Sequence, residues 1–168
     1  GNGYNVDGMY GNQCWDYVAL LYWQYGLTLI TKAGGGGARD CWTSSRWANS
    51  KPPFTSHTGK TNIKRGDILV FGAGEWGHIG FADEDYNGSG SIAVLGQNQG
   101  SGGTPPPISH PNGGTTANVK TLGTINFLGA FRYREWEDTP PTPPITRSKG
   151  SFKWVLMARR LNQMRNQL

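Results

Sequence analysis

The sequence has few cysteines, little charge and no long apolar run, and each shortage excludes a class of protein. Only two cysteines occur in 168 residues, which is too few for a small secreted domain held together by several disulfides. No apolar run approaches the roughly 18 to 20 residues of a membrane-spanning helix, so no membrane span is expected. The first residues lack the basic start and apolar stretch of a signal peptide, and none is expected.

The excess of basic over acidic residues is confined to one end of the chain. Residues 1–144 carry ten Lys or Arg against eleven Asp or Glu, whereas residues 145–168 carry six Lys or Arg and no acid. The net charge of +5 therefore belongs to the C-terminal segment. A nucleic-acid-binding body needs a basic face, so nucleic acid is not expected as a partner.

The first half of the chain contains helical patterns. Val18, Leu21, Tyr22 and Tyr25 follow the i, i+3, i+4, i+7 spacing, which predicts a helix that begins at Cys14. The following glycine is a natural end for that helix. A shorter helix is predicted over residues 39–50, before a pair of prolines.

The second half is typical of short strands. Apolar runs predict strands at residues 67–71, 78–82, 91–95 and 128–133. Asn87-Gly88-Ser89-Gly90 predicts a hairpin turn, and residues 99–118 are expected to form a long loop. The overall pattern indicates an α+β domain over residues 1–138, a Pro-rich linker over 139–146 and a basic helical tail over 147–168. The tail is too short to bury a core of its own, so it is expected to need a partner, or to be the start of, or a remnant from, a second module.

Cys14 and His78 are the candidate reactive pair, because one opens the predicted helix and the other opens a predicted strand. A helix N-terminus directs unpaired N–H groups and partial positive charge at such a sulfur, and an imidazole can take its proton. His57 and His110 lie in segments rich in Pro, Gly, Ser and Thr, and are expected to be solvated. The layout indicates a thiol nucleophile and its base.

Cys14 and His78 can each also be explained as structural residues without a catalytic role. A lone cysteine is more often an ordinary buried residue, and a histidine on a strand is often a satisfied core residue. A Cys14–Cys41 disulfide is a further alternative, although Cys41 fits better as a small buried hydrophobe.

A catalytic imidazole needs a partner that orients its second ring nitrogen. Asn98 lies at the end of the strand expected to pair with that of His78, and Gln97 is the other side chain available there. An amide can hold the tautomer without adding charge. Asn98 is therefore the predicted orienting residue.

Four segments, in this order, resemble the cysteine, histidine-dependent amidohydrolase/peptidase (CHAP) family. They are Asn12-Gln13-Cys14-Trp15-Asp16, Arg65-Gly66-Asp67-Ile68-Leu69-Val70-Phe71, Gly77-His78-Ile79-Gly80 and Val94-Leu95-Gly96-Gln97-Asn98. The resemblance covers about residues 3–136. It implies a papain-like α+β CHAP fold, with N-terminal helices packed on an antiparallel sheet. It also implies Cys14 as nucleophile, His78 as base and Asn98 as orienting residue. Many members have an acidic residue two positions before that Asn, where this chain has Gly96.

The family cleaves peptidoglycan amide bonds, often as the catalytic part of bacteriophage endolysins. The resemblance therefore implies a cysteine-dependent peptidoglycan hydrolase, either an N-acetylmuramoyl-L-alanine amidase or an endopeptidase. The rival from another class is a non-catalytic cell-wall-binding module on the same fold; a small-molecule amidase or an intracellular thiol protease is less favoured. A phage lysin of this kind is expected to be made in the host cytoplasm and to act on the cell wall. No organic cofactor is expected.

A candidate metal site is the second feature near Cys14. Five residues have the offsets 1, 3, 5, 7 and 12 of an EF-hand calcium loop: Asn5, Asp7, Met9, Gly11 and Asp16. Position 6 is Tyr10 rather than Gly and position 12 is Asp rather than Glu, so a metal-free Asx-rich loop fits the spacing as well. Some CHAP domains bind calcium before the cysteine, and the resemblance implies a structural calcium ion here. Asp16, about 200° around the helix from Cys14, is expected to point toward the preceding loop.

Three residues beside the motifs are candidates for a substrate groove: Trp15, Trp76 and Gln97. Core packing is the alternative for both tryptophans. The basic tail is expected to contact a cell-wall-binding module, another subunit or an anionic wall polymer, unless it is a solvated helix end.

Overall fold

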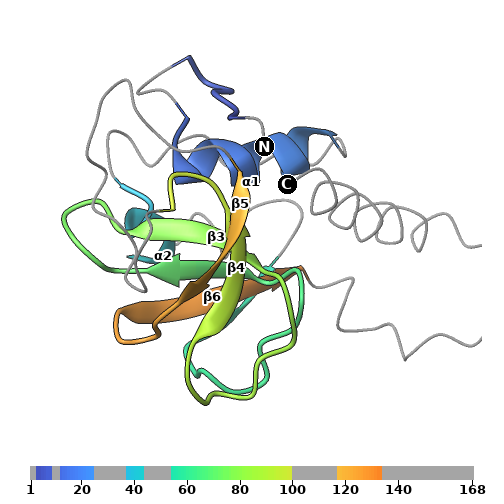
Figure 1. Cartoon of the computed structure of the whole chain (residues 1–168), viewed down its shortest axis with the longest axis vertical. Coiled ribbons are helices and arrows are strands. Elements are labelled where there is room, and N and C mark those ends of the chain that lie inside the picture. The colour runs from blue at the N-terminus through green and yellow to red at the C-terminus, as the bar shows by residue number, and fades with distance from the viewer. Residues whose placement is uncertain (1–2, 9–11, 25–36, 44–53, 100–116, 134–168) are drawn as a thin grey trace, which may run out of the picture.

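The computed structural model describes residues 3–8, 12–24, 37–43, 54–99 and 117–133, and in these ranges it has two helices and six strands (Figure 1). The elements in chain order are α1 (Cys14–Gln24), α2 (Asp40–Thr43), β1 (Phe54–His57), β2 (Ile68–Phe71), β3 (His78–Ala82), β4 (Ile92–Gly96), β5 (Asn118–Leu122) and β6 (Phe127–Tyr133). Cys14 and His78 therefore begin elements, as their sequence context predicts.

The six strands form one antiparallel sheet in the order β1-β6-β2-β3-β4-β5. In the β2–β3 pair, Phe71 lies opposite His78 and Val70 lies opposite Ile79. β4 pairs with the other side of β3, where Leu95 lies opposite Phe81. His78 thus begins a strand that has a neighbour on both sides, which holds its backbone in place.

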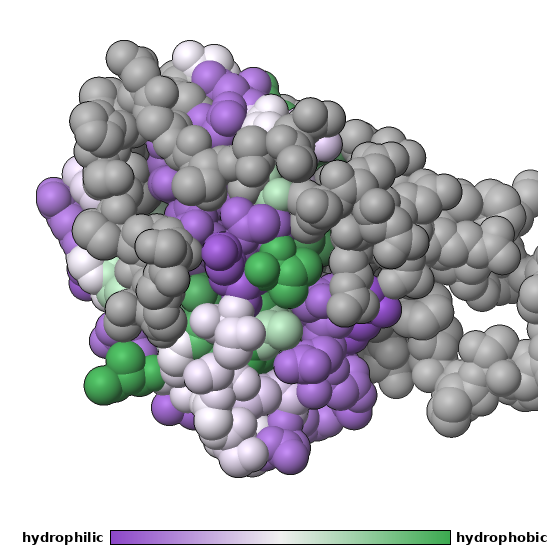
Figure 2. Space-filling model, viewed as in Figure 1, coloured by the Kyte–Doolittle hydropathy of each residue, from purple (hydrophilic) through white to green (hydrophobic). Residues whose placement is uncertain are grey.

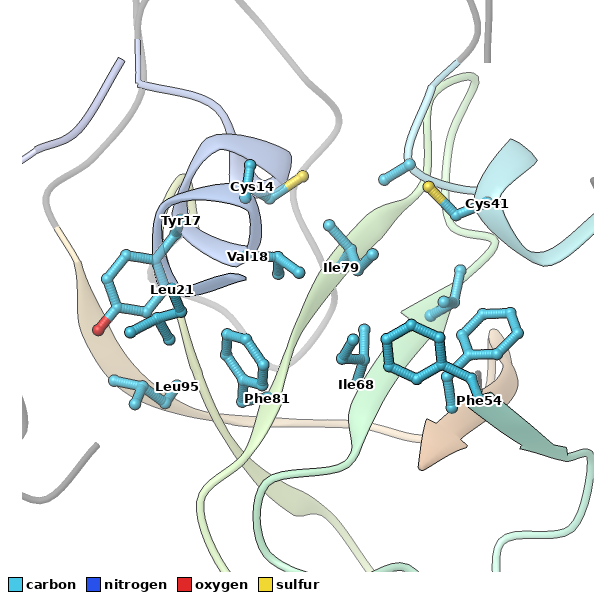
Figure 3. Packing of buried hydrophobic residues seen from close by; sticks show 14 of the residues in the cluster. Cys14, Tyr17, Val18, Leu21, Cys41, Phe54, Ile68, Ile79, Phe81 and Leu95 are labelled. Carbon is cyan, nitrogen blue, oxygen red and sulfur yellow. The ribbon is translucent and has the colours of Figure 1, made fainter. Parts of the chain in front are cut away.

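Alternation along the strands divides the buried side chains between the two faces of the sheet. On one face α1 packs against β3 and β4 (Figure 3), through Tyr17, Val18, Leu21, Ile79, Phe81 and Leu95. The second cluster, on the other face, includes Leu69, Phe71, Ile92, Val94, Leu122 and Ala130. Burying each large apolar side chain contributes roughly 1.5–3 kcal/mol. The packing of α1 therefore holds its first residue against β3.

α2 packs at the other end of the same cluster. Cys41 is buried there, and the Trp42 ring lies 5.1 Å from that of Phe131 between centroids. A Cβ on Gly129 would meet the Trp42 ring at 2.1 Å, so only glycine leaves room for the indole on β6. Trp42 is thus partly buried and packs against the core cluster. Cys14 and Cys41 are both free thiols, so the alternative of a disulfide between them was wrong.

The sequence predicted the inner strands better than the outer ones. The strand predicted at 78–82 coincides with β3, and those at 67–71, 91–95 and 128–133 match β2, β4 and β6 to within one residue. β1 and β5 were not predicted. Both are edge strands with polar residues, and their pairing with β6 and β4, rather than an apolar run of their own, makes them strands.

Several predicted segments lie outside the described residues: most of the loop 99–118, the end of the helix 39–50, the linker 139–146 and the tail 147–168. In the described ranges no helix has the length and apolar character needed to cross a membrane. Among the described residues visible in Figure 2, hydrophilic and neutral areas predominate and the apolar areas are small. Among described residues the exposed large hydrophobic side chains are Trp76 and Ile125.

Candidate active site

Cys14 is the first residue of α1, and its side chain is only 1% exposed. Burial raises the pKa of its thiol from 9.0 to about 11, although the backbone N–H groups of Ile79, Trp15 and Cys14 itself act in the opposite direction. The thiol is therefore protonated at neutral pH. The same N–H groups are in place to stabilise a thiolate when one forms.

His78 is equally buried at the start of β3, beside Phe71, with ring centroids 6.2 Å apart. Its Nε2 atom lies 3.2 Å from Oε1 of Gln99. Burial lowers the pKa of the imidazole from 6.5 to about 4, while the hydrogen bond with Gln99 raises it. The ring is therefore neutral at pH 7 and has a lone pair that can accept a proton.

The sulfur of Cys14 interacts with the backbone of Ile79, the residue that follows His78. α1 packs on β3 along this stretch. In this structure the thiol and the imidazole do not share a hydrogen bond, because the imidazole is bonded to Gln99 and the sulfur to backbone groups. The fold thus brings the two residues to one end of β3 with their side chains in separate interactions.

Asn98 does not make the contact with His78 that was predicted for it. Its Nδ2 atom donates to Oε1 of Gln13, at 2.9 Å, and Gln99 bonds to the imidazole instead. The physical reason is the backbone of Asn98, which has a positive φ of 55°. This left-handed residue interrupts the alternation of side chains beyond β4, so the next side chain folds back toward His78.

Gln97 was predicted to line a substrate groove, but it is fully buried. Its Oε1 atom accepts the N–H of Tyr4, at 3.0 Å, and its Nε2 atom donates to the backbone oxygens of Tyr4 and Gln13. This side chain therefore holds the N-terminal segment in place. Gln97, Asn98 and Gln99 together link the residues before α1 to the start of β3. The sequence offered Asn98 and Gln97 as partners but gave no signal for Gln99.

Asp16 caps α1 and holds the loop that precedes it. One carboxylate oxygen accepts the N–H of Gln13 at 2.8 Å, and the other accepts that of Val6 at 3.0 Å. The first of these bonds is one half of a capping box. The side chain therefore points toward the preceding loop, as its position in the helix predicted, and both oxygens are already engaged by backbone groups.

The residues predicted to bind calcium are only partly described. Met9 and Gly11 lie outside the described residues, Asn5 is exposed and Asp7 is half-buried. Burial raises the pKa of Asp16, and the negative charge of Asp7 raises it further. Two neighbouring carboxylates suit a calcium ion. Within the described ranges, however, no group of three or more His, Cys, Asp or Glu converges as a metal site, so the carboxyl pair supplies only part of a coordination shell.

The two tryptophans predicted for the groove differ in exposure. Trp76, two residues before His78, is 36% exposed, and its backbone oxygen accepts the N–H of Arg39 at 3.0 Å. Trp15 is half-buried and packs against the cluster beneath α1. Trp76 is thus the one of the pair whose side chain is open to a ligand.

Fold and site together define an antiparallel α+β domain with a buried Cys and His at one end of its sheet. The CHAP domain model matches residues 2–98, and the chain belongs to this family.

Two similar proteins are a phage endopeptidase and an endolysin of known structure. Over 105 residues the chain is 33% identical to the D-alanyl-L-alanine endopeptidase of Streptococcus phage B30, a match that covers 60% of this chain and 23% of that protein. It also resembles the crystal structure of wild-type endolysin LysIME-EF1, with a TM-score of 0.60 and 27% identity, over 79% of this chain and 57% of that one. The chain thus spans about a quarter of the endopeptidase and just over half of the endolysin chain.

Proposed function

We propose that residues 1–138 are the catalytic domain of a phage endolysin, papain-like in fold, that hydrolyses bacterial peptidoglycan through Cys14. The observation that carries the proposal is the position of the Cys14 sulfur, at the start of α1 and against the backbone of the residue after His78. Membership of the CHAP family and similarity to a phage endopeptidase and an endolysin support cell-wall peptide as the substrate.

The first half of the reaction is acyl transfer to sulfur. The thiol of Cys14 attacks a carbonyl carbon and gives its proton to the neutral imidazole of His78. Rotation about χ1 of Cys14 is the movement that brings the sulfur to the imidazole, which stays bonded to Gln99. The N–H of Cys14, which interacts with the sulfur, supports the oxyanion of the tetrahedral intermediate. The imidazolium then protonates the leaving amine as the C–N bond breaks.

Hydrolysis of the acyl-enzyme restores the site. His78 takes a proton from water, hydroxide adds to the thioester carbonyl, and the C–S bond breaks. The proton on the imidazole returns to the departing thiolate. Both groups thus return to the neutral forms that burial favours.

Asn98 has a supporting role in this scheme. It donates a hydrogen bond to the side chain of Gln13, and Gln97 bonds to the backbone oxygen of the same residue. Gln13 immediately precedes Cys14, so the two amides hold the first turn of α1 and the nucleophile in place.

The bond that is cleaved is a peptide or amide bond of peptidoglycan. The relationship to a D-alanyl-L-alanine endopeptidase favours endopeptidase activity, and an N-acetylmuramoyl-L-alanine amidase is the other candidate. Mass spectrometry of fragments released from purified cell walls separates the two. New N-termini within the peptides indicate an endopeptidase, and lactyl groups freed from alanine indicate an amidase.

We also propose a structural calcium ion in the loop before α1, held by Asn5, Asp7 and Asp16 and by the backbone carbonyls of Met9 and Gly11. The charge of Asp7 beside the buried carboxyl of Asp16 supports it. Bound there, calcium would neutralise the two carboxylates and tie the loop to the helix that presents Cys14.

Replacement of the nucleophile tests the proposed enzyme. Cys14→Ala is expected to abolish release of peptides from purified cell walls, because the proposed acyl intermediate forms on the sulfur of Cys14. Cys41→Ala is the matched control, since it removes the other buried thiol. The control should cost roughly 1–2 kcal/mol of stability through a small cavity, with cleavage retained.

Normal cleavage by a folded Cys14→Ala variant would sink the proposal. In that case the rival, a non-catalytic cell-wall-binding module on the same fold, is examined by sedimentation of the protein with insoluble walls.

A further inference from the structure

We propose that Gln99 is the positioning residue of His78: its side-chain amide fixes the imidazole as the Nε2–H tautomer and leaves Nδ1 as the base for Cys14. The inference rests on the proposed function, in which His78 accepts the thiol proton. It goes beyond that function by replacing the predicted partner, Asn98, with a residue that no motif in the sequence singled out.

The orientation of the Gln99 amide follows from its other partners. Its Nε2 atom lies 3.1 Å from the backbone oxygen of Val94 and 3.0 Å from that of Asn118. It also lies 3.2 Å from Oδ1 of Asn118. Backbone oxygens can only accept hydrogen bonds, so the NH₂ group must face them. Oε1 is then the atom that faces His78.

The tautomer of His78 follows from the amide orientation. Oε1 of Gln99 can only accept, so the ring nitrogen 3.2 Å away must carry a hydrogen. Burial keeps the imidazole neutral at pH 7, and a neutral ring carries one hydrogen only. The hydrogen is therefore on Nε2 and the lone pair on Nδ1. Nδ1 is bonded to Cγ and so lies nearer the β3 backbone, where the sulfur of Cys14 interacts with Ile79.

Gly96 supplies the space for this amide. A Cβ at this position would lie 3.3 Å from Cδ and 3.4 Å from Oε1 of Gln99. A larger side chain at position 96 would therefore enter the volume that the amide occupies. The chain lacks the acid expected at Gly96, and the amide of Gln99, arriving from three residues further along, takes its place beside the imidazole.

The surrounding sheet makes the amide a rigid partner. Val94 lies in β4 and Asn118 begins β5, and Gln99 itself is 1% exposed. Rotation of the buried amide would place its oxygen against two backbone oxygens and leave buried polar groups without hydrogen bonds, which is unfavourable. One side chain therefore joins β4 and β5 to the first residue of β3.

The direct test is the tautomer of His78, read from its ring ¹⁵N shifts and long-range ¹H–¹⁵N couplings at pH 7. The wild type is expected to show Nε2–H alone. Gln99→Met keeps the size of the side chain but removes the acceptor, and should give a mixture of tautomers. Gln97→Met is the matched control, because it removes another buried amide that does not contact His78; its tautomer should stay Nε2–H. An Nδ1–H ring in the wild type, or pure Nε2–H in Gln99→Met, would overturn the proposal.

Cell-wall cleavage gives an independent readout. Gln99→Met is expected to lower kcat by about 10- to 100-fold, with KM changed less than about threefold, because an imidazole with mixed tautomers is a base for only part of the time. The double variant Gly96→Glu/Gln99→Ala places a carboxylate in the vacated volume and should recover at least about tenfold over Gln99→Ala alone. Wild-type kcat in folded Gln99→Met would contradict the positioning role.

The two proposals can fail separately. If the wild type releases no cell-wall peptides, the proposed function fails, whereas the tautomer of His78 still decides the role of Gln99. If Gln99→Met does not fold, the wild-type tautomer alone decides it, because only Nε2–H agrees with the amide orientation.

Discussion

At the scale of single residues, burial sets the protonation of the candidate pair. Cys14 and His78 are each 1% exposed, and burial raises the pKa of the thiol while it lowers that of the imidazole. Both shifts favour the neutral form. The protein without substrate therefore holds a thiol and a neutral base, and the thiolate forms only when the proton moves to His78.

The pKa of His78 predicts a loss of stability in acid. The group titrates near 6.5 when unfolded and near 4 when folded, so between these values the unfolded chain binds a proton that the native state does not. The neutral imidazole of His78 therefore contributes about 3 kcal/mol to the free energy of unfolding. This stability is fully present above about pH 6.5 and is lost as the pH falls toward about 4. Urea unfolding across this range measures it.

His78→Gln is the control for that measurement, since it keeps a donor for Gln99 and cannot titrate. Carboxyl groups contribute equally to both proteins, so the difference between their stability curves isolates His78. Parallel curves would show that the imidazole is not buried as described.

At the scale of elements, two short segments hold the ends of α1 and β3 together. The first is the segment before α1, in which the backbone N–H groups of Val6 and Gln13 donate to the carboxylate of Asp16 in the first turn of the helix. After β4, the amides of residues 97–99 bond to the N-terminal segment, to Gln13 and to His78. The candidate site therefore depends on the connections between elements as much as on the elements themselves.

The calcium proposal belongs to the first of these segments. Removing the ion with a chelator is expected to lower the melting temperature of the wild type by several degrees, because an ion that binds only the folded state stabilises it. Asp7→Ala should reduce or abolish this response. Asp85→Ala is the control, since Asp85 is an exposed carboxylate paired with Lys64 and should leave the response intact. Equal responses in wild type and Asp7→Ala would contradict the site.

The sequence predicted those parts of this architecture that depend on local pattern. β3 has a continuous apolar run and a neighbour on each side, and it was predicted to the residue. β1 and β5 were missed because they depend on pairing across the sheet. Cys14 and His78 were found from their place at the start of elements. Gln99 could not be found from the sequence, because the left-handed backbone of Asn98 redirects the side chain of Gln99. Alternation along a strand does not predict that turn.

At the scale of the whole molecule, a buried ion pair joins the loop before β2 to β6, in chain order the last strand of the sheet. Asp67, just before β2, is fully buried and accepts two hydrogen bonds from Arg132 of β6, at 2.9 and 2.7 Å. The guanidinium also donates to the backbone oxygen of Asn62, and the carboxylate accepts the N–H of Lys64. This pair ties the loop before β2 to the last strand.

Removing one partner of this pair is expected to be costly. Arg132→Met leaves the carboxylate of Asp67 buried without its counter-charge, which should lower the free energy of unfolding by about 3–5 kcal/mol. Lys64→Met is the control: it removes the exposed pair with Asp85 and should cost less than about 1 kcal/mol. Urea denaturation at neutral pH measures both, and similar losses in the two variants would contradict the distinction.

The burial of Cys14 slows oxidation of its thiol. Oxidants and disulfides react with the thiolate form of cysteine. A buried thiol whose pKa is about 11 is almost entirely protonated at neutral pH, so very little thiolate is present. Cys41, the other sulfur, is buried as well. The protein should therefore keep its reactive sulfur reduced on storage in air without a reducing agent, and lose it to sulfenic acid or mixed disulfides only when the domain opens.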